Sequence, residues 1–321
     1  MSTRRGLVFL YLLLLSLYLM VFGRDLWAAI TLPELLIAPV MALGSFVAGS
    51  TFLGGGAVAF PAMTKILATD ADTAKNFSLA IQSVGMTSAS LYILTRIKNL
   101  SFDFMGWYLC SAVLGMLICL LFMQGTFSSI DLRIGFTLFI SCFLVIYLWT
   151  LHDQDGEAHT EIRIHHQDHL LIFLCGLAGG LLSGLLGSGA DLFAFCLLSL
   201  YFRVDLKLAT QMSVIIMASV SIVGIAAQWL FFDRVQPLVI ELWYMAAPVV
   251  LLGAPLGAFF CRRLPNHFLV IFITLIVIIE VATTLLFVPI APSRALYYGF
   301  ALVVSCLFLL LLSKVNRPKT I

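Results

Sequence analysis

Long apolar runs, each close to the length of a membrane-spanning helix, divide the chain from end to end. A helix needs about 20 apolar residues to cross a hydrocarbon core about 30 Å thick. Eight runs near this length each predict one spanning helix: Leu7–Gly23, Phe77–Thr95, Phe104–Met123, Leu132–Leu151, Thr210–Phe232, Val239–Phe260, Phe268–Val288 and Ala295–Leu312. We therefore predict an all-α polytopic membrane protein.

The first run could be mistaken for a signal peptide because Arg4 and Arg5 precede it. Its apolar stretch exceeds the roughly 7–15 residues of a signal core, and no A-x-A-like cleavage site follows Phe22. We predict a retained N-terminal helix with its connector, residues 1–35.

Two further apolar segments are too long for one crossing. Leu36–Thr64 has 29 residues and His169–Phe202 has 34. As straight helices, at about 1.5 Å per residue, they would reach roughly 44 and 51 Å. Gly54-Gly55-Gly56 interrupts the first and Gly187-Ser188-Gly189 interrupts the second. Glycine lets the chain turn where other residues clash, so each segment is predicted to be two half-helices joined at a Gly-rich tip.

The two broken segments are similar to each other. Leu53–Ala57 reads LGGGA and Leu186–Ala190 reads LGSGA, 133 residues further on. Ala74–Ser78 and Ala209–Ser213 match at an offset of 135, and three long apolar helices follow each tip. Internal repeats are the usual construction of secondary transporters. We predict repeat 1 at residues 36–151 and repeat 2 at 169–313, with a linker at 152–168 and a basic tail at 314–321.

The composition supports lipid as the surrounding solvent. Apolar residues make up 62% of the chain and charged residues 11%, against about 25% charged in a soluble domain. The net charge of +2 gives no basic field for nucleic acid. The seven cysteines contain no CxxC pair, so neither a disulfide framework nor a metal site is predicted, and we expect no cofactor. The oligomeric state is not indicated.

The distribution of positive charge places both termini in the cytoplasm. If each broken segment is a hairpin, 12 of the 18 Lys and Arg residues lie inside, and the same count results if each crosses once. The positive-inside rule therefore fixes the termini but not the path. Segment length favours hairpins, which give inverted repeats; single crossings would give parallel ones.

The linker, with adjoining His169, holds five of the six histidines among several carboxylates. A metal- or pH-sensing loop is one interpretation. A solvated linker is favoured because the spacings match no standard ligand motif.

The Gly-rich tips are the main candidates for a substrate site. Non-helical backbone at membrane depth must be buried in protein or line a cavity. Free N–H groups where each second half-helix begins, with its positive dipole end, could hold a small oxyanion without any arginine. Alternatively the glycines serve close helix packing, but two matched tips favour binding. The predicted backbone site is Gly54, Gly55, Gly56, Ala57, Gly187, Ser188 and Gly189.

Polar side chains open the helix after each tip. They are Asn76, Ser78 and Gln82 in the first repeat and Gln211 and Ser213 in the second. Lining the substrate site would explain them, and ordinary capping and interhelical hydrogen bonding would explain them equally well.

Two carboxylates, Asp191 and Glu280, lie within apolar runs, where such residues are costly and are functional hypotheses by default. Asp191 directly follows the second tip. Protonated, it would tolerate an anion and could couple transport to a proton. Alternatively it stabilises the start of its half-helix. Glu280 is either a second proton-relay group or a polar contact facing the bundle.

The sequence lacks the second catalytic residue that an intramembrane protease would need. Gly187–Asp191 is one residue away from the GxGD of intramembrane aspartyl proteases, but no second membrane aspartate lies at comparable depth. No mid-helix histidine could activate Ser188 as a nucleophile. We predict that the protein is not an enzyme.

The order of these motifs resembles that of a known family. The elements are Gly44, Gly49, Gly54-Gly55-Gly56 and Pro61 in the first repeat, Gly176, Gly179-Gly180, Gly184, Gly187, Gly189 and Ala209–Ser213 in the second, and Gly253–Ala258 before Arg262-Arg263-Leu264-Pro265. They resemble the sulfite exporter TauE/SafE family over nearly the whole chain after residue 36. Ala194 in place of a proline, the GSG tip and Asp191 depart from the family pattern. The resemblance implies transport of small, often sulfur-containing anions across the bacterial plasma membrane.

Together these features predict a secondary transporter of a small anion such as sulfite, thiosulfate or an organosulfonate, bound between the two tips. Its predicted partners are this substrate and the lipid bilayer. The alternative is a non-transporting membrane scaffold or assembly factor whose glycines serve packing.

Overall fold

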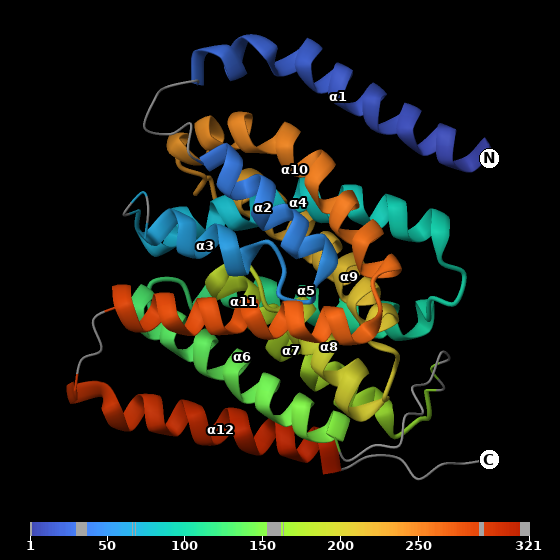
Figure 1. Ribbon diagram of the computed structural model, residues 1–321. Coiled ribbons are helices and arrows are strands. Elements are labelled where there is room, and N and C mark those ends of the chain that lie inside the picture. The colour runs from blue at the N-terminus through green and yellow to red at the C-terminus, as the bar shows by residue number, and fades with distance from the viewer. Residues whose placement is uncertain are drawn as a thin grey trace.

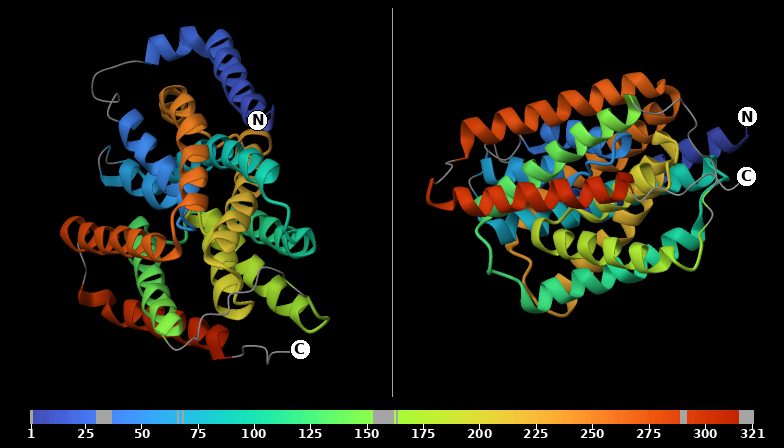
Figure 2. Two further views of the ribbon diagram at one scale, coloured as in Figure 1. Left: turned by 45° about the vertical axis from the view of Figure 1, so that its right-hand side comes forward. Right: turned by 90° about the horizontal axis from the view of Figure 1, so that it is seen from below.

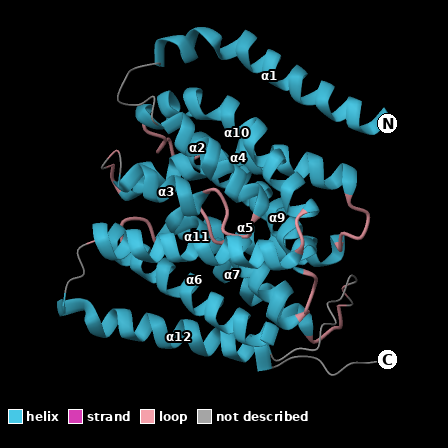
Figure 3. Ribbon diagram, in the orientation of Figure 1, coloured by secondary structure: helices cyan, strands magenta, loops and turns pink. Residues whose placement is uncertain are grey.

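The computed structural model describes residues 2–29, 37–65, 67, 69–152, 162, 164–288 and 292–314. Every regular element in these ranges is helical (Figures 1 and 3). The elements are α1 (Ser2–Ala29), α2 (Ile37–Ser50), α3 (Gly56–Lys65), α4 (Ala71–Arg96), α5 (Phe102–Phe122), α6 (Ser129–His152), α7 (Asp168–Leu186), α8 (Ala190–Cys196), η2 (Leu197–Tyr201), α9 (Leu206–Leu230), α10 (Pro237–Arg263), α11 (Asn266–Phe287), η3 (Pro292–Arg294) and α12 (Ala295–Lys314). The predicted all-α class is confirmed.

Nine helices in the described ranges are long and apolar enough to cross a membrane: α1, α4, α5, α6, α7, α9, α10, α11 and α12. They correspond to the eight predicted spanning runs and the first arm of the second broken segment. Large apolar side chains face outward, including Met20, 86% exposed, and Leu296, 90% exposed. Apolar surface on this scale needs a lipid or protein partner. The chain is therefore a polytopic membrane protein, as predicted.

Both over-long segments are broken at their glycines, as predicted. The first consists of α2 and α3, separated by residues 51–55, and Gly54 has a φ of +67°. The second breaks between α7 and α8, where Gly187 has a φ of +76°. Residues with a Cβ rarely adopt this left-handed region. The helix therefore stops where only glycine fits the turn.

Each broken segment folds back beside itself as a hairpin. α3 packs against α2, and α8 packs against α7. The α2–α3 hairpin opens at the end of the bundle where α4 begins, whereas the α7–α8 hairpin opens at the opposite end, where α1 begins and α12 ends (Figures 1 and 2). Hairpins entering from opposite ends are what inverted repeats would produce; the duplication itself remains an inference from sequence.

The first arm of each hairpin packs against a helix from the other half of the chain. α2 lies against α10 and α7 lies against α5, the two most extensive helix contacts among the described elements. Gly49 leaves no room for a Cβ beside the backbone of Ala254, and Gly180 leaves none beside that of Ala112. Small residues let helix backbones approach closely in membranes. Glycines within the helices therefore serve packing, whereas those at the tips turn the chain.

An N-cap fixes the start of α4, the helix that carries the predicted site residues Asn76, Ser78 and Gln82. The carboxylate of Asp70 accepts hydrogen bonds from the backbone N–H groups of Asp72 and Thr73, both at 3.1 Å, and from Thr73 Oγ1 at 2.6 Å. Partial burial acts to raise the pKa of Asp70, but these hydrogen bonds outweigh it and leave the pKa below its ordinary value. The cap sets the register of the α4 side chains that follow.

The predicted linker and tail fall largely outside the described residues, which exclude 153–161, 163 and 315–321. At the described end of the linker, Asp168 accepts hydrogen bonds from the His165 N–H and from Tyr201 Oη, both at 2.9 Å. Asp168 begins α7 and Tyr201 ends η2. This contact therefore ties the two ends of the second hairpin together.

Candidate functional site

The two Gly-rich tips meet inside the bundle. A Cβ built on Gly54 would collide with the carboxylate of Asp191 and would lie 3.0 Å from Ser188 Oγ. Ser188 and Asp191 are at most 2% exposed. Two turns that are about 130 residues apart in sequence thus share one buried contact, and Gly54 can be there only because it has no side chain.

Gln82 of α4 touches both tips. Its Nε2 donates to the carbonyl oxygen of Gly187 at 2.6 Å, and its Cγ would lie 3.0 Å from a Cβ on Gly55. Ser78 Oγ donates to the same Gly187 oxygen at 3.2 Å. Both side chains are almost fully buried. Helix α4 therefore holds the second tip through a pair of polar side chains one turn apart, and Gln82 also packs beside the first tip.

Asp191 occupies the start of α8 with one oxygen and leaves the other unpaired. Its Oδ1 accepts hydrogen bonds from the N–H groups of Gly189 at 3.2 Å and Leu192 at 3.0 Å. The N–H of Ala190 donates to Ser183 Oγ at 2.8 Å. Asp191 Oδ2 is buried without a hydrogen-bond partner. An anion bound to these N–H groups would have to displace Asp191 or Ser183.

The first tip is tightly packed as well. Gly56 and Ala57 form the first turn of α3. A cavity of about 10 Å³ lies next to Gly55 and Gln82, which is room for about one water. Gln82 Oε1 is buried there without a partner. In this conformation the contact between the tips is closed to an oxyanion.

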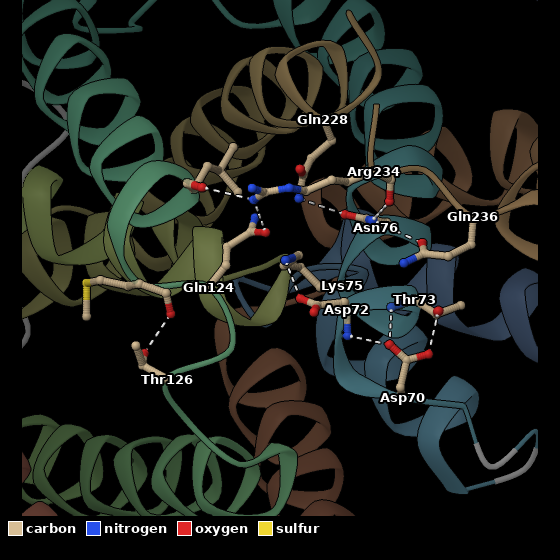
Figure 4. Close-up of polar contacts among 12 residues, drawn as sticks. Asp70, Asp72, Thr73, Lys75, Asn76, Gln124, Thr126, Gln228, Arg234 and Gln236 are labelled. Carbon is tan, nitrogen blue, oxygen red and sulfur yellow. Dashed lines mark hydrogen bonds and ion pairs between the residues drawn. The ribbon is translucent and has the colours of Figure 1, made fainter. Parts of the chain in front are cut away.

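A larger polar cavity, here called the vestibule, lies one turn of α4 away from the second tip. Figure 4 shows polar side chains that line it. Its volume is about 300 Å³. It is formed where α4 and α10 begin and where α5 and α9 end, at the end of the bundle away from the termini (Figure 1). Its lining residues are Asp72, Lys75, Asn76, Gln124, Gln228, Asp233, Arg234, Val235 and Gln236.

Two cations face this vestibule. The side chain of Lys75 is only 3% exposed, and its Nζ lies 2.7 Å from Asp72 Oδ1. Arg234 Nη1 donates to Gln124 Oε1 at 2.5 Å, and Arg234 makes no ion pair within the described residues. Gln124 Nε2 is buried without a partner. Unsatisfied donors and a guanidinium outside any ion pair offer partners to an anion here, and Asp72 and Asp233 line the same cavity.

An amide network closes the side of the vestibule. Asn76 Nδ2 donates to the carbonyl of Arg234 at 2.8 Å and to Gln236 Oε1 at 3.1 Å. Gln228 Nε2 donates to Asn76 Oδ1 at 3.0 Å. Asn76 therefore holds the loop between α9 and α10, which presents Arg234.

The vestibule and the tips share the first turns of α4. The carbonyl oxygen of Lys75 would lie 2.7 Å from a Cβ on Gly187, and the Ser78 side chain is equally close to it. The side chains of Lys75 and Asn76 line the vestibule from the same turn. Only this turn of helix separates the cavity from the second tip.

The structure brings together eight of the predicted site residues: Gly54, Gly55, Ser78, Gln82, Gly187, Ser188, Gly189 and Asp191. Asn76 faces the vestibule instead. Gln211 and Ser213 are buried in α9, and Ser213 Oγ donates to its own helix at the Thr210 carbonyl. The contacts described for these two residues do not reach a tip.

Glu280 lies at a different contact. Its Oε1 accepts hydrogen bonds from Thr284 at 3.3 Å and from Thr137 at 3.5 Å, and Arg133 interacts with it electrostatically. Thr137 and Arg133 lie on α6. Glu280 therefore joins α11 to α6 through polar contacts, and both interpretations of its role, a proton-relay group and a polar contact facing the bundle, stay predictions.

Sequence reasoning missed the charged residues of the vestibule. No Lys or Arg lies deep inside an apolar run: Lys75 lies where one run begins, and Arg234 lies in a loop. A signal was present, because the repeat match places Lys75 opposite the neutral Thr210. Only the fold shows that Lys75 is buried and that Arg234 approaches it across the same cavity.

A bundle of apolar spanning helices, with two broken helices meeting at its centre beside a polar cavity, has the architecture of a secondary transporter core. The family model described as sulfite exporter TauE/SafE matches residues 36–285. The chain belongs to this family of membrane transporters. No curated protein and no solved structure matches the chain significantly.

Proposed function

We propose that the protein is a secondary transporter of a small sulfur-containing oxyanion, such as sulfite, thiosulfate or an organosulfonate. The observation that carries the proposal is the contact between the two Gly-rich tips directly beside a vestibule holding Lys75 and Arg234. Family membership supports transport of an anion of this class. We further propose that the protein resides in a bacterial plasma membrane with both termini in the cytoplasm.

The vestibule is where we expect the anion to bind in this conformation. Its volume suits a small oxyanion with a few waters. Arg234 can donate two parallel hydrogen bonds to an oxyanion, and Gln124 Nε2 adds an unsatisfied donor. Lys75 would exchange part of its interaction with Asp72 for the substrate. These groups supply the positive charge that the apolar helix interiors lack.

Passage through the protein requires the tips to separate. The hairpins enter from opposite ends and touch at Gly54 and Asp191, so a small rotation of one hairpin against the other would open the path to the opposite side. Rocking of one repeat against the other around a fixed site is the usual form of alternating access. Ser78, Gln82, Ser188 and the tip backbone would then contact the anion.

Transport by purified protein in liposomes tests this proposal, with radiolabelled sulfite and thiosulfate as probes. Gly54→Ala adds a Cβ at a positive φ, which costs about 1–2 kcal/mol, and the same Cβ collides with Asp191. Because the added Cβ disturbs the contact between the tips, we expect slower flux. Arg234→Gln should raise KM, because it removes a guanidinium that faces the vestibule.

The matched control is Gly106→Ala on α5, where a Cβ meets open space. It should transport like the parent chain. A second measurement is thermal stability in detergent, where an anion at 100 times its Kd should add about 2.7 kcal/mol. If none of sulfite, thiosulfate, sulfoacetate and taurine moves the melting temperature or crosses the membrane, the scaffold alternative replaces the transporter.

A further inference from the structure

A further cavity lies between α1 and the body of the protein, at the end of the bundle where α1 begins. Its volume is about 790 Å³, within the roughly 300–1,000 Å³ of ligand sites. Its walls are apolar side chains of α1 and α10, among them Leu12, Leu252, Leu256 and Phe259. Leu12 and Leu256 are still 58% and 54% exposed. The two helices therefore leave an apolar groove that they do not fill.

Three arginines line one end of this groove: Arg96 in the last turn of α4, and Arg262 and Arg263 in the last turn of α10. None forms an ion pair with a carboxylate of the described residues. Arg263 lies over the Phe259 ring at 4.5 Å, which holds its charge above the apolar wall. The groove thus combines an apolar body with a cationic mouth.

Tyrosine hydrogen bonds fix α1 at the edge of this groove. Tyr11 Oη donates to the Ser88 carbonyl and Tyr18 Oη donates to the Tyr244 carbonyl, both at 2.6 Å. Tyr18, Phe22, Trp243 and Tyr244 pack as an aromatic cluster further along α1. These contacts fix α1 on α4 and α10, and the groove lies between them on the arginine side.

We propose that this groove binds one anionic phospholipid, with its phosphate on Arg262, Arg263 and Arg96 and an acyl chain along α1 and α10. Basic pockets between spanning helices recognise anionic headgroups. Free phosphate would satisfy the arginines but would leave the apolar walls uncovered, whereas a lipid covers both. The family match begins at residue 36, so the lipid would join α1 to the matched core.

Native mass spectrometry of the full chain in mild detergent tests this, with phosphatidylglycerol titrated against phosphatidylcholine. The parent chain should bind one phosphatidylglycerol about tenfold more tightly than phosphatidylcholine. Arg262→Gln combined with Arg263→Gln should remove this preference. Leu256→Trp should weaken binding of both lipids by filling the groove without changing charge.

The charge-matched control is Lys98→Gln combined with Lys314→Gln, two exposed cations away from the groove lining; it should bind phosphatidylglycerol like the parent. Equal binding of the two lipids, equal loss in the control, or displacement of phosphatidylglycerol by millimolar inorganic phosphate would overturn the proposal. A lipid-free dimer that Leu256→Trp dissociates would assign the groove to a second copy instead. Because the readout is lipid mass rather than flux, its outcome does not depend on the transport proposal.

Discussion

At the residue scale, Asp191 is the group whose environment most constrains a mechanism. One carboxylate oxygen is held by the N–H groups of its own tip, and the other faces Gly54 without a partner. A buried charge without a partner is costly. A proton on Oδ2 would remove that charge just where an approaching anion would meet it. This geometry supports proton coupling, while its Oδ1 contacts support the structural role as well.

Asp191→Asn separates the two roles. The amide oxygen can keep the hydrogen bonds to the tip, but the side chain can no longer gain or lose a proton. We expect flux to continue and its dependence on pH to vanish, measured as initial rates in liposomes on the acidic and alkaline sides of neutrality. Asp191→Ala is the companion variant, and it should lower stability because it removes both hydrogen bonds. An Asn variant with the parental rate and pH profile would exclude coupling at this residue.

At the element scale, α12 is an addition attached at the periphery. It lies outside the family-matched residues and packs mainly on α6. Asp131 at the start of α6 pairs with Arg294 and accepts a hydrogen bond from Tyr298 Oη at 3.0 Å. Further along, the thiols of Cys142 and Cys306 lie 3.2 Å apart. The contacts of Asp131 with Arg294 and Tyr298 anchor α12 to α6 without involving the tips.

Removing the anchor should loosen α12 and spare transport. Because the Arg294 side chain is half exposed, we expect Arg294→Gln to cost only about 1 kcal/mol, seen as a lower melting temperature in detergent and faster proteolysis within α12. Lys98→Gln, an exposed cation without an ion pair in the described residues, is the control and should change neither. A large loss of flux in Arg294→Gln would show that α12 takes part in the transport cycle.

The sequence predicts the helices of this protein but not the contacts between distant helices and loops. Spanning helices and their breaks follow from apolar run length and from glycine runs, which are local properties. The predicted helix ends therefore lie within six residues of the observed ones. The pairings of α2 with α10 and of α7 with α5 depend on which glycines meet which backbones. The vestibule depends on loops meeting in space. Neither the helix pairings nor the vestibule has a signature in the local sequence. The position of Arg234 beside this cavity therefore could not be predicted from the sequence.

At the scale of the whole molecule, the path of the chain decides whether the halves are inverted. In the structure, α4 and α6 begin at the same end of the bundle, opposite the end where α1 begins and α12 ends (Figure 1). Residues 70 and 128 directly precede these two helices and therefore lie at that end. If the first broken segment instead crossed the membrane once, residue 70 would lie on the same side as the N-terminus. The hairpins and the proposed cytoplasmic termini therefore predict that residue 70 faces the outside of the cell.

Cysteine labelling in intact cells checks this topology. A membrane-impermeant maleimide should label Asp70→Cys and Ser128→Cys from outside and should label Lys98→Cys only after the cells are opened. Asp70→Cys loses an N-cap worth about 1 kcal/mol, so Ser128→Cys, away from that cap, guards against a local disturbance. The parent chain measures background from its native thiols. Labelling of position 98 from outside and of 70 only after lysis would reverse the topology.

The packing of α2 against α10, a helix from the other half of the chain, also affects how the protein folds during synthesis. When the ribosome has released α2, its partner α10 has not yet been made. Gly49 packs against Ala254, which follows roughly 200 residues later in the chain. At about 5–20 residues per second, synthesis of that stretch takes roughly 10–40 s. During that interval the glycine face of the first hairpin has no native neighbour. Completion of this membrane protein is therefore a late event, and the newly inserted first half is the stage most vulnerable to wrong partners and quality-control proteases.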